Sequence, residues 1–370
     1  MTVIDSDAHV VETERTWDFI PASDAHLRPV IVTKPDKAGN DVRYWEIDGK
    51  IRGTVRQPVG KRTEWDPNRV APDMESQSAA SGRRMEATDA SKHMEDVGAR
   101  LKHMDELGID FQMLYPTIFL RKLTDTDEAR VAICRGYNRW LADIWAQSDG
   151  RLRWACVLPL SVMDESIREL NWAAEHGANG VFMRGIEEEG VLQDSYFFPL
   201  YQEMERLNLA VTVHIGNGNP AIESLLSSGP GGSPFSSMRM FSVAACHSWI
   251  LAGIPQQFPT LRIAFVEAAA QWVPFVINDL ARRFPGRHGR AAPVDLLAEN
   301  RVWVTCQTDD DIGYLTRVAG ENNLLIGTDY GHTDQSAEIE ALRIFQEQGT
   351  VEPRVVEKIL DTNPRAVYGF

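Results

Sequence analysis

The chain begins with an acid and a histidine at a spacing that suits a metal site. Asp7 and His9 follow the apolar pair Val3-Ile4, and side chains two residues apart on a β-strand point to the same face. Both would therefore project from the end of a first strand. A carboxylate oxygen beside an imidazole nitrogen supplies half of the ligands that a divalent metal needs. Asp5 shares this face and is a spare candidate acid.

Three later apolar runs also end in ionisable residues. His214 ends Ala-Val-Thr-Val-His, Glu267 ends Ile-Ala-Phe-Val-Glu, and Asp329 ends Leu-Leu-Ile-Gly-Thr-Asp. Such groups at the ends of buried strands cost free energy unless they serve one another or a metal. Each alone has a simpler explanation, such as a turn residue or a buried histidine with its own partner. Together they predict one divalent ion, Zn²⁺ first and Mn²⁺ or Fe²⁺ as alternatives. The predicted ligands are Asp7, His9, His214 and Asp329.

The candidates for proton transfer are Glu267, Asp329 and His332, the last three residues beyond Asp329 in a loop that should rim the pocket. Burial raises the pKa of a carboxyl group, so a buried acid can exchange protons near neutral pH. An equally good interpretation of Glu267 is a structural carboxylate paired with Arg262 or Arg184.

Arg184 ends another apolar run and is the best candidate to hold a substrate carboxylate, because guanidinium binds carboxylate with two parallel donors. The alternative is an ion pair with Glu187 or Glu188. Further candidates to line the pocket, each with core packing as its alternative, are Tyr115, Trp272 and His247.

The elements that must position these residues alternate between short apolar runs and amphipathic helical segments. The apolar runs fit strands buried on both faces of a parallel sheet. Eight such β-then-α units predict an α/β fold, a (β/α)8 TIM barrel forming one domain over residues 1–370, with a doubly wound open sheet as the alternative. In a barrel the C-terminal ends of the strands meet at one face, which would bring the candidates together. The predicted strands are Val3–His9, Phe111–Pro116, Arg153–Pro159, Gly180–Arg184, Ala210–Ile215, Arg262–Glu267, Arg301–Cys306 and Leu324–Asp329.

About 100 residues separate the first two strands, far more than the dozen or so that a crossover needs. We therefore expect an insertion over about residues 20–92. Within it, Asp48-Gly49 between Val42–Ile47 and Lys50–Val55 predicts a β-hairpin. The polar tracts Asp66–Ser91 and Gly216–Ser237 are expected to be loops at the barrel mouth. Among the predicted helices, Met240–Gln257 should break near Pro255, and another should run from Ser336 to Gln348.

Composition limits the partners. The 370 residues carry a net charge of −15, which disfavours nucleic acid and anionic membranes as partners. Four widely spaced cysteines suggest reduced thiols in a cytoplasmic protein. No apolar stretch approaches 18 residues, so we predict neither a membrane span nor a signal peptide. The expected partner is a small-molecule substrate, and homo-oligomerisation remains open.

The order of these motifs resembles the amidohydrolase-related branch of the amidohydrolase superfamily. The resemblance covers about residues 1–20 and 95–370, and includes Glu106–Thr117, Phe258–Arg262, Gly327–Tyr330 and Asn363–Gly369. It implies a barrel, one divalent metal, and either hydrolysis or non-oxidative decarboxylation of a carboxylate substrate. By position, it also implies the same four metal ligands.

One departure from this branch affects the predicted reaction. Its decarboxylases usually end the sixth strand in a histidine followed by glycines, whereas this chain has Glu267-Ala268-Ala269. We therefore predict a metal-dependent hydrolase that attacks an acyl bond (amide, lactone, ester or thioester) of a small carboxylate-bearing substrate with metal-activated water. The alternatives are a non-oxidative decarboxylase of an aromatic or unsaturated carboxylic acid, and a barrel without catalytic activity.

Overall fold

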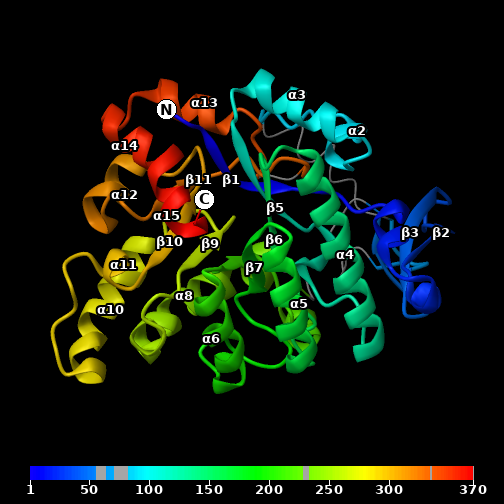
Figure 1. Cartoon of the computed structure of the whole chain (residues 1–370), viewed down its shortest axis with the longest axis horizontal. Helices are drawn as coiled ribbons and strands as arrows, with labels where there is room; N and C mark the ends of the chain where they lie inside the picture. The colour runs from blue at the N-terminus through cyan, green and yellow to red at the C-terminus, as the bar shows by residue number, and fades with distance from the viewer. Residues whose placement is uncertain (56–63, 71–81, 228–232, 334–335, 370) are drawn as a thin grey trace.

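A computed structural model of the chain describes residues 1–55, 64–70, 82–227, 233–333 and 336–369. Eight strands form one sheet in which all neighbours are parallel, and the helices surround it (Figure 1). All eight predicted strands are present, with ends that differ by a few residues. In their order around the sheet they are β1 (Ile4–His9), β5 (Phe111–Tyr115), β6 (Leu152–Cys156), β7 (Ala178–Arg184), β8 (Ala210–His214), β9 (Ile263–Val266), β10 (Val302–Cys306) and β11 (Leu324–Ile326).

The sheet closes between its first and last strands. The backbone N–H groups of Thr328 and Asp329 donate to Asp7 O at 3.1 and 2.8 Å, and His9 N donates to Tyr330 O at 2.7 Å. Gly327 makes this approach feasible, because a Cβ atom there would lie 2.2 Å from Cβ of Asp7. The structure is therefore the predicted (β/α)8 barrel and not an open sheet.

Helices cover the outside of the barrel. The break in Met240–Gln257 falls at Gly253, whose φ of +82° ends α8, and not at Pro255. The helix predicted from Ser336 starts later, because Glu338 N donates to Thr328 O and the chain turns before α13 begins at Ala341. The principal helices are α3 (Val97–Leu107), α4 (Asp127–Gln147), α5 (Met163–Glu175), α6 (Phe198–Leu207), α8 (Met240–Ala252), α10 (Val273–His288), α12 (Ile312–Ala319), α13 (Ala341–Gln348) and α15 (Asn363–Tyr368).

The insertion after β1 forms a small antiparallel sheet beside α4 (Figure 1). The predicted hairpin is confirmed: β3 (Asp41–Ile47) and β4 (Lys50–Thr54) are joined by Asp48 and Gly49, both at positive φ. The third strand, β2 (Val30–Pro35), was not predicted, because this half-exposed strand lacks a buried apolar face. Within the two polar tracts, residues 71–81 and 228–232 lie outside the described residues, and α7 (Pro220–Ser227) occupies part of the second.

All four cysteines are buried free thiols, as expected. Among the described residues, no helix has both the length and the apolar character needed to cross a membrane.

Candidate metal centre

The end of β1 contains a β-bulge that aims its side chains. Asp5 pairs with Gln112 but Ala8 pairs with Leu114, so β1 has one extra residue between these points. The carboxylate of Asp5 accepts from the N–H of Asp7 at 3.2 Å. Bulges re-aim side chains next to active sites. Asp5 is thus part of the support of the strand and not a spare acid in the centre.

The centre is built around two histidines. Nδ1 of His9 donates to Pro116 O at 3.0 Å, and Nδ1 of His214 donates to Ile215 O at 3.2 Å. A carbonyl oxygen only accepts, so each Nδ1 carries the proton and, in a neutral ring, Nε2 presents a lone pair. Burial lowers the pKa of His9 well below its ordinary value, which keeps that ring neutral. The two Nε2 atoms nevertheless lie 3.1 Å apart.

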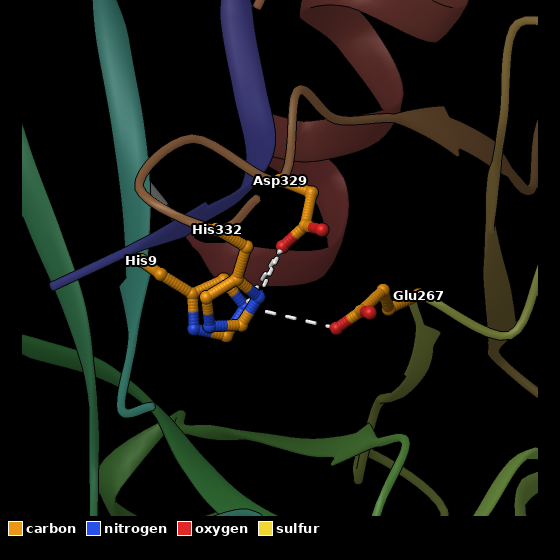
Figure 2. A group of neighbouring side chains, drawn as sticks. All are labelled: His9, Glu267, Asp329 and His332. Carbon is orange, nitrogen blue, oxygen red and sulfur yellow. Dashed lines mark ion pairs between the residues drawn. The ribbon is translucent and has the colours of Figure 1, made fainter. Parts of the chain in front are cut away.

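Three buried carboxylates surround these nitrogens. Asp7 Oδ1 lies 3.6 Å from His9 Nε2 and 3.4 Å from His214 Nε2. Glu267 Oε2 lies 3.8 and 3.2 Å from the same two atoms, and Asp329 Oδ1 lies 3.4 Å from His9 Nε2. Figure 2 shows Asp329 and Glu267 directed at the stacked rings of His9 and His332. Strands β1 and β8 and the segments that follow β9 and β11 thus bring their donors together in two groups that share His9: Asp7, His9 and His214 in one, and His9, Glu267, Asp329 and His332 in the other.

Two of these carboxylates sit on unusual backbone. Glu267 has a φ of +63° and Asp329 a φ of +53°, a left-handed conformation that costs non-glycine residues free energy. Glu267 follows directly on the end of β9, and Asp329 lies three residues beyond the end of β11. Strained backbone of this kind persists where the surroundings impose it and is concentrated at functional sites.

His332 forms the far side of the centre. Its ring stacks on His9 with centroids 3.7 Å apart, and its Nδ1 lies 2.7 Å from Asp329 Oδ1. Thr117 donates its hydroxyl to Val10 O at 2.7 Å, so His332 Nε2 at 3.0 Å must donate to Thr117. Nδ1 of the same ring is left facing Asp329, so the two side chains form a close pair at the edge of the centre.

The donor set fits a divalent metal. The two Nε2 atoms lie 3.1 Å apart on rings whose Nδ1 atoms are bonded to carbonyl oxygens, and nitrogens on one ion that each lie about 2.0–2.1 Å from it are spaced at about this distance. Asp7 Oδ1 is buried and accepts no hydrogen bond from the described residues. The Nδ1–carbonyl bonds of both histidines are the outer contacts usual for metal-binding imidazole. We infer that a metal would be held here by Asp7, His9, His214 and Asp329.

Tyr115 lies beside this centre but does not point its hydroxyl into it. Its ring centroid is 5.2 Å from that of His214 and 6.1 Å from that of His9. The hydroxyl instead bonds with that of Tyr368 on α15 at 3.1 Å, and Tyr368 donates to Ser6 O at 3.2 Å. Tyr115 was predicted to line the pocket. Its ring instead packs against the two histidine rings, and its hydroxyl is bonded to Tyr368.

The remaining three candidates are engaged by other partners. His247 was predicted to face the pocket, but its Nε2 bonds with Asp279 of α10 at 2.9 Å, because α8 turns this side chain toward its neighbouring helix. Arg184 is engaged by Glu187, whose Oε2 accepts from Nε at 2.9 Å, so its predicted role as a free carboxylate clamp gives way to the ion-pair alternative. Trp272 donates its indole N–H to Ala269 O at 2.7 Å.

Sequence reasoning missed the residues that support the centre. Thr117 ends the motif Glu106–Thr117 but was given no role. Glu12 accepts from the N–H groups of Thr117 and Ile118 at 3.0 and 3.2 Å. Arg100 on α3 donates to His9 O at 3.2 Å. No sequence signal separates it from the other arginines, since its contacts depend on where α3 packs.

Comparison with known proteins adds to this geometry. Residues 4–370 match the protein-family model described as Amidohydrolase. A curated relative, 2-amino-3-carboxymuconate-6-semialdehyde decarboxylase of Dictyostelium discoideum, is 23% identical over 265 residues, 68% of this chain and 72% of the relative. An amidohydrolase from Mycobacterium avium subsp. paratuberculosis K-10 has a TM-score of 0.76 at 18% identity, covering 100% of this chain and 98% of its own. The 5-carboxyvanillate decarboxylase of Novosphingobium aromaticivorans, crystallised with manganese and a nitrobenzoic acid, has a TM-score of 0.67 at 16% identity, covering 100% and 96%.

Proposed function

Because the chain belongs to the amidohydrolase family, we propose that it is a metal-dependent carboxy-lyase that removes CO₂, without oxidation, from a small aromatic or unsaturated carboxylic acid. Two of the similar proteins reported above are named as decarboxylases of such acids. This reverses the preference for hydrolysis drawn from Glu267 alone. The proposed metal is a divalent ion, and the manganese in one neighbour makes Mn²⁺ as good a candidate as Zn²⁺.

The observation that carries the proposal is the 3.1 Å approach of the Nε2 atoms of His9 and His214, each with its Nδ1 bonded to a carbonyl oxygen. A buried cluster of five such donors suits a cation, and the proposed ligands are Asp7, His9, His214 and Asp329. When bound, the metal supplies a Lewis acid that orients a substrate carboxylate and a neighbouring oxygen.

The residues of the chain then supply the proton that decarboxylation needs. The bond between the carboxylate carbon and its neighbour breaks, the electron pair stays on the neighbouring carbon, and CO₂ leaves. A proton must be delivered to that carbon. We assign this role to the Asp329–His332 pair, whose Oδ1 and Nδ1 atoms lie 2.7 Å apart, with Glu267 as the second candidate. Burial of the centre excludes water that would compete for these groups.

Hydrolysis remains the second candidate, because a carboxylate and not an imidazole ends the sixth barrel strand. Glu267 Oε2 lies 3.2 Å from His214 Nε2. A carboxylate so placed could remove a proton from a water molecule that attacks an acyl carbon. The two reactions thus assign opposite directions of proton transfer to the same centre.

The test is to load the purified protein with Zn²⁺ or Mn²⁺ and supply hydroxybenzoates, carboxyvanillate and unsaturated dicarboxylic acids. A decarboxylase releases bicarbonate and, in D₂O, places one deuterium on the carbon that lost CO₂. A hydrolase given esters, lactones or amides instead places oxygen-18 from labelled water into a product carboxylate. A protein that binds neither metal and releases no product from either panel would contradict both assignments.

A further inference from the structure

A chain of three buried polar side chains leads from helix α3 to Asp5, near the start of β1. Arg100 donates through Nε to Gln112 Oε1 at 2.7 Å, and Gln112 Nε2 donates to Asp5 Oδ2 at 2.9 Å. All three are 0% exposed. We propose that Arg100 is a positioning residue, which acts through Gln112 and Asp5 to set the affinity of the centre for its metal.

Asp5 holds two segments of the barrel together. Its Oδ1 accepts from the N–H of Asp7 at 3.2 Å and from the N–H of Thr328 at 2.9 Å, and its Oδ2 accepts from the Thr328 hydroxyl at 2.6 Å. Asp7 and Asp329, the next residue after Thr328, are both proposed ligands. One carboxylate therefore fixes the bulge of β1 and the end of β11, the two segments that must meet for the ligand set to form.

Arg100 also contacts the end of β1 directly. Nη1 donates to the carbonyl of His9 at 3.2 Å and to that of Ser91 at 3.4 Å. Its guanidinium lies 3.6 Å from the centroid of the Tyr330 ring, and Tyr330 follows Asp329. Arg100 thus contacts the backbone of one ligand residue and the neighbour of another.

This arrangement of buried polar groups costs free energy. Taking a guanidinium and a carboxylate out of water is expensive, and apolar residues of similar volume often stabilise a fold better. Burial lowers the pKa of Arg100 to about 10. A planar fork that reaches Gln112, His9 and Ser91 at once gives a geometry that lysine cannot reproduce. Placement of the metal ligands explains why such a fork is present.

The test measures metal affinity directly. We expect Arg100→Lys to weaken Mn²⁺ and Zn²⁺ binding about 10-fold or more, as substitutions of outer contacts typically do, while the melting temperature of the metal-free protein changes little. The dissociation constants are measured by competition with a chelating dye, and the electron paramagnetic resonance spectrum of bound Mn²⁺ should change. Arg262→Lys is the matched control, because Arg262 also donates to backbone carbonyls, of Asn208 and Ala366, and should bind metal like the wild type.

Gln112→Met keeps the side-chain volume and removes the hydrogen bonds of Gln112 with Arg100 and Asp5. It therefore decides the question if Arg100→Lys does not fold. It should weaken metal binding similarly. Wild-type affinity in either folded variant, or an equal loss in Arg262→Lys, would overturn the inference. The inference rests on the proposed metal centre, but the failures differ. A wild-type protein without metal affinity refutes the proposed function, whereas a metal-binding wild type with unaffected variants refutes only the role of Arg100.

Discussion

Glu267 and His214 come from neighbouring strands and approach to 3.2 Å between Oε2 and Nε2. The glutamate stands on left-handed backbone at the end of β9, and both side chains are buried. A carboxylate at this distance from a proposed ligand is placed either to bind the proposed metal or to exchange protons with a substrate bound there.

Replacing Glu267 with glutamine separates these two roles. If Glu267 transfers protons, Glu267→Gln should lower kcat about 10²- to 10⁴-fold while the metal content stays near that of the wild type. Metal content is measured by atomic absorption, and kcat with the substrate found in the panel. Loss of the metal together with activity would make Glu267 a ligand. Full activity in Glu267→Gln would remove it from the mechanism.

The metal should stabilise the fold, and His214 should be required for this effect. A ligand present at 100 times its dissociation constant stabilises the folded state by about 2.7 kcal/mol. We expect Mn²⁺ or Zn²⁺ to raise the melting temperature of the wild type, and a chelator to reverse the rise. His214→Ala should show no rise. His247→Ala is the control, since its partner Asp279 lies on α10, and it should respond to metal as the wild type does.

The hydrogen bond between Tyr115 on β5 and Tyr368 on α15 should stabilise the fold. Tyr368 donates to Ser6 O, so Tyr115 donates to Tyr368. We expect Tyr368→Phe to lower the free energy of unfolding by about 1–3 kcal/mol, because a buried hydroxyl loses its acceptor. In the Tyr368→Phe background, Tyr115→Phe should lower the free energy of unfolding by less than it does in the wild type. Urea unfolding of both single variants and the double variant measures this coupling, and strict additivity would show that the two tyrosines act independently.

Glu12 should make the stability of the metal-free protein depend on pH. Burial raises the pKa of Glu12 from 4.5 to about 7. The folded state therefore binds this proton more tightly than the unfolded state does. The stability from Glu12 is fully present below pH 4.5 and is lost as the pH rises through 7. A shift of this size corresponds to about 3 kcal/mol.

Glu12→Gln removes this dependence. We expect its stability relative to the wild type to improve by up to about 3 kcal/mol between pH 4.5 and pH 8, measured by urea unfolding at several pH values in the presence of a chelator. A constant difference between the two proteins across this range would show that Glu12 does not titrate there.

The sequence by itself determined the barrel and the principal donors. Eight apolar runs of strand length, with polar groups at the ends of β1, β8, β9 and β11, allow few other folds, because strands buried on both faces must be covered by helices. Asp7, His9, His214 and Asp329 were predicted as ligands because a barrel brings strand ends together at one face, and they stay the proposed ligands. The hairpin at Asp48-Gly49 was equally local, since two residues decide its turn.

Only the tertiary structure decided which polar groups serve the centre and which serve the fold. Asp5, Asp7 and His9 look alike at a spacing of two residues, but a bulge directs Asp5 to Thr328 and Gln112. Arg184 and His247 were plausible pocket residues until Glu187 and Asp279 proved to be their partners. The roles of Arg100 and Thr117 depend on contacts between segments far apart in the chain. Local sequence carries no record of such contacts, because they arise from the packing of complete elements against one another.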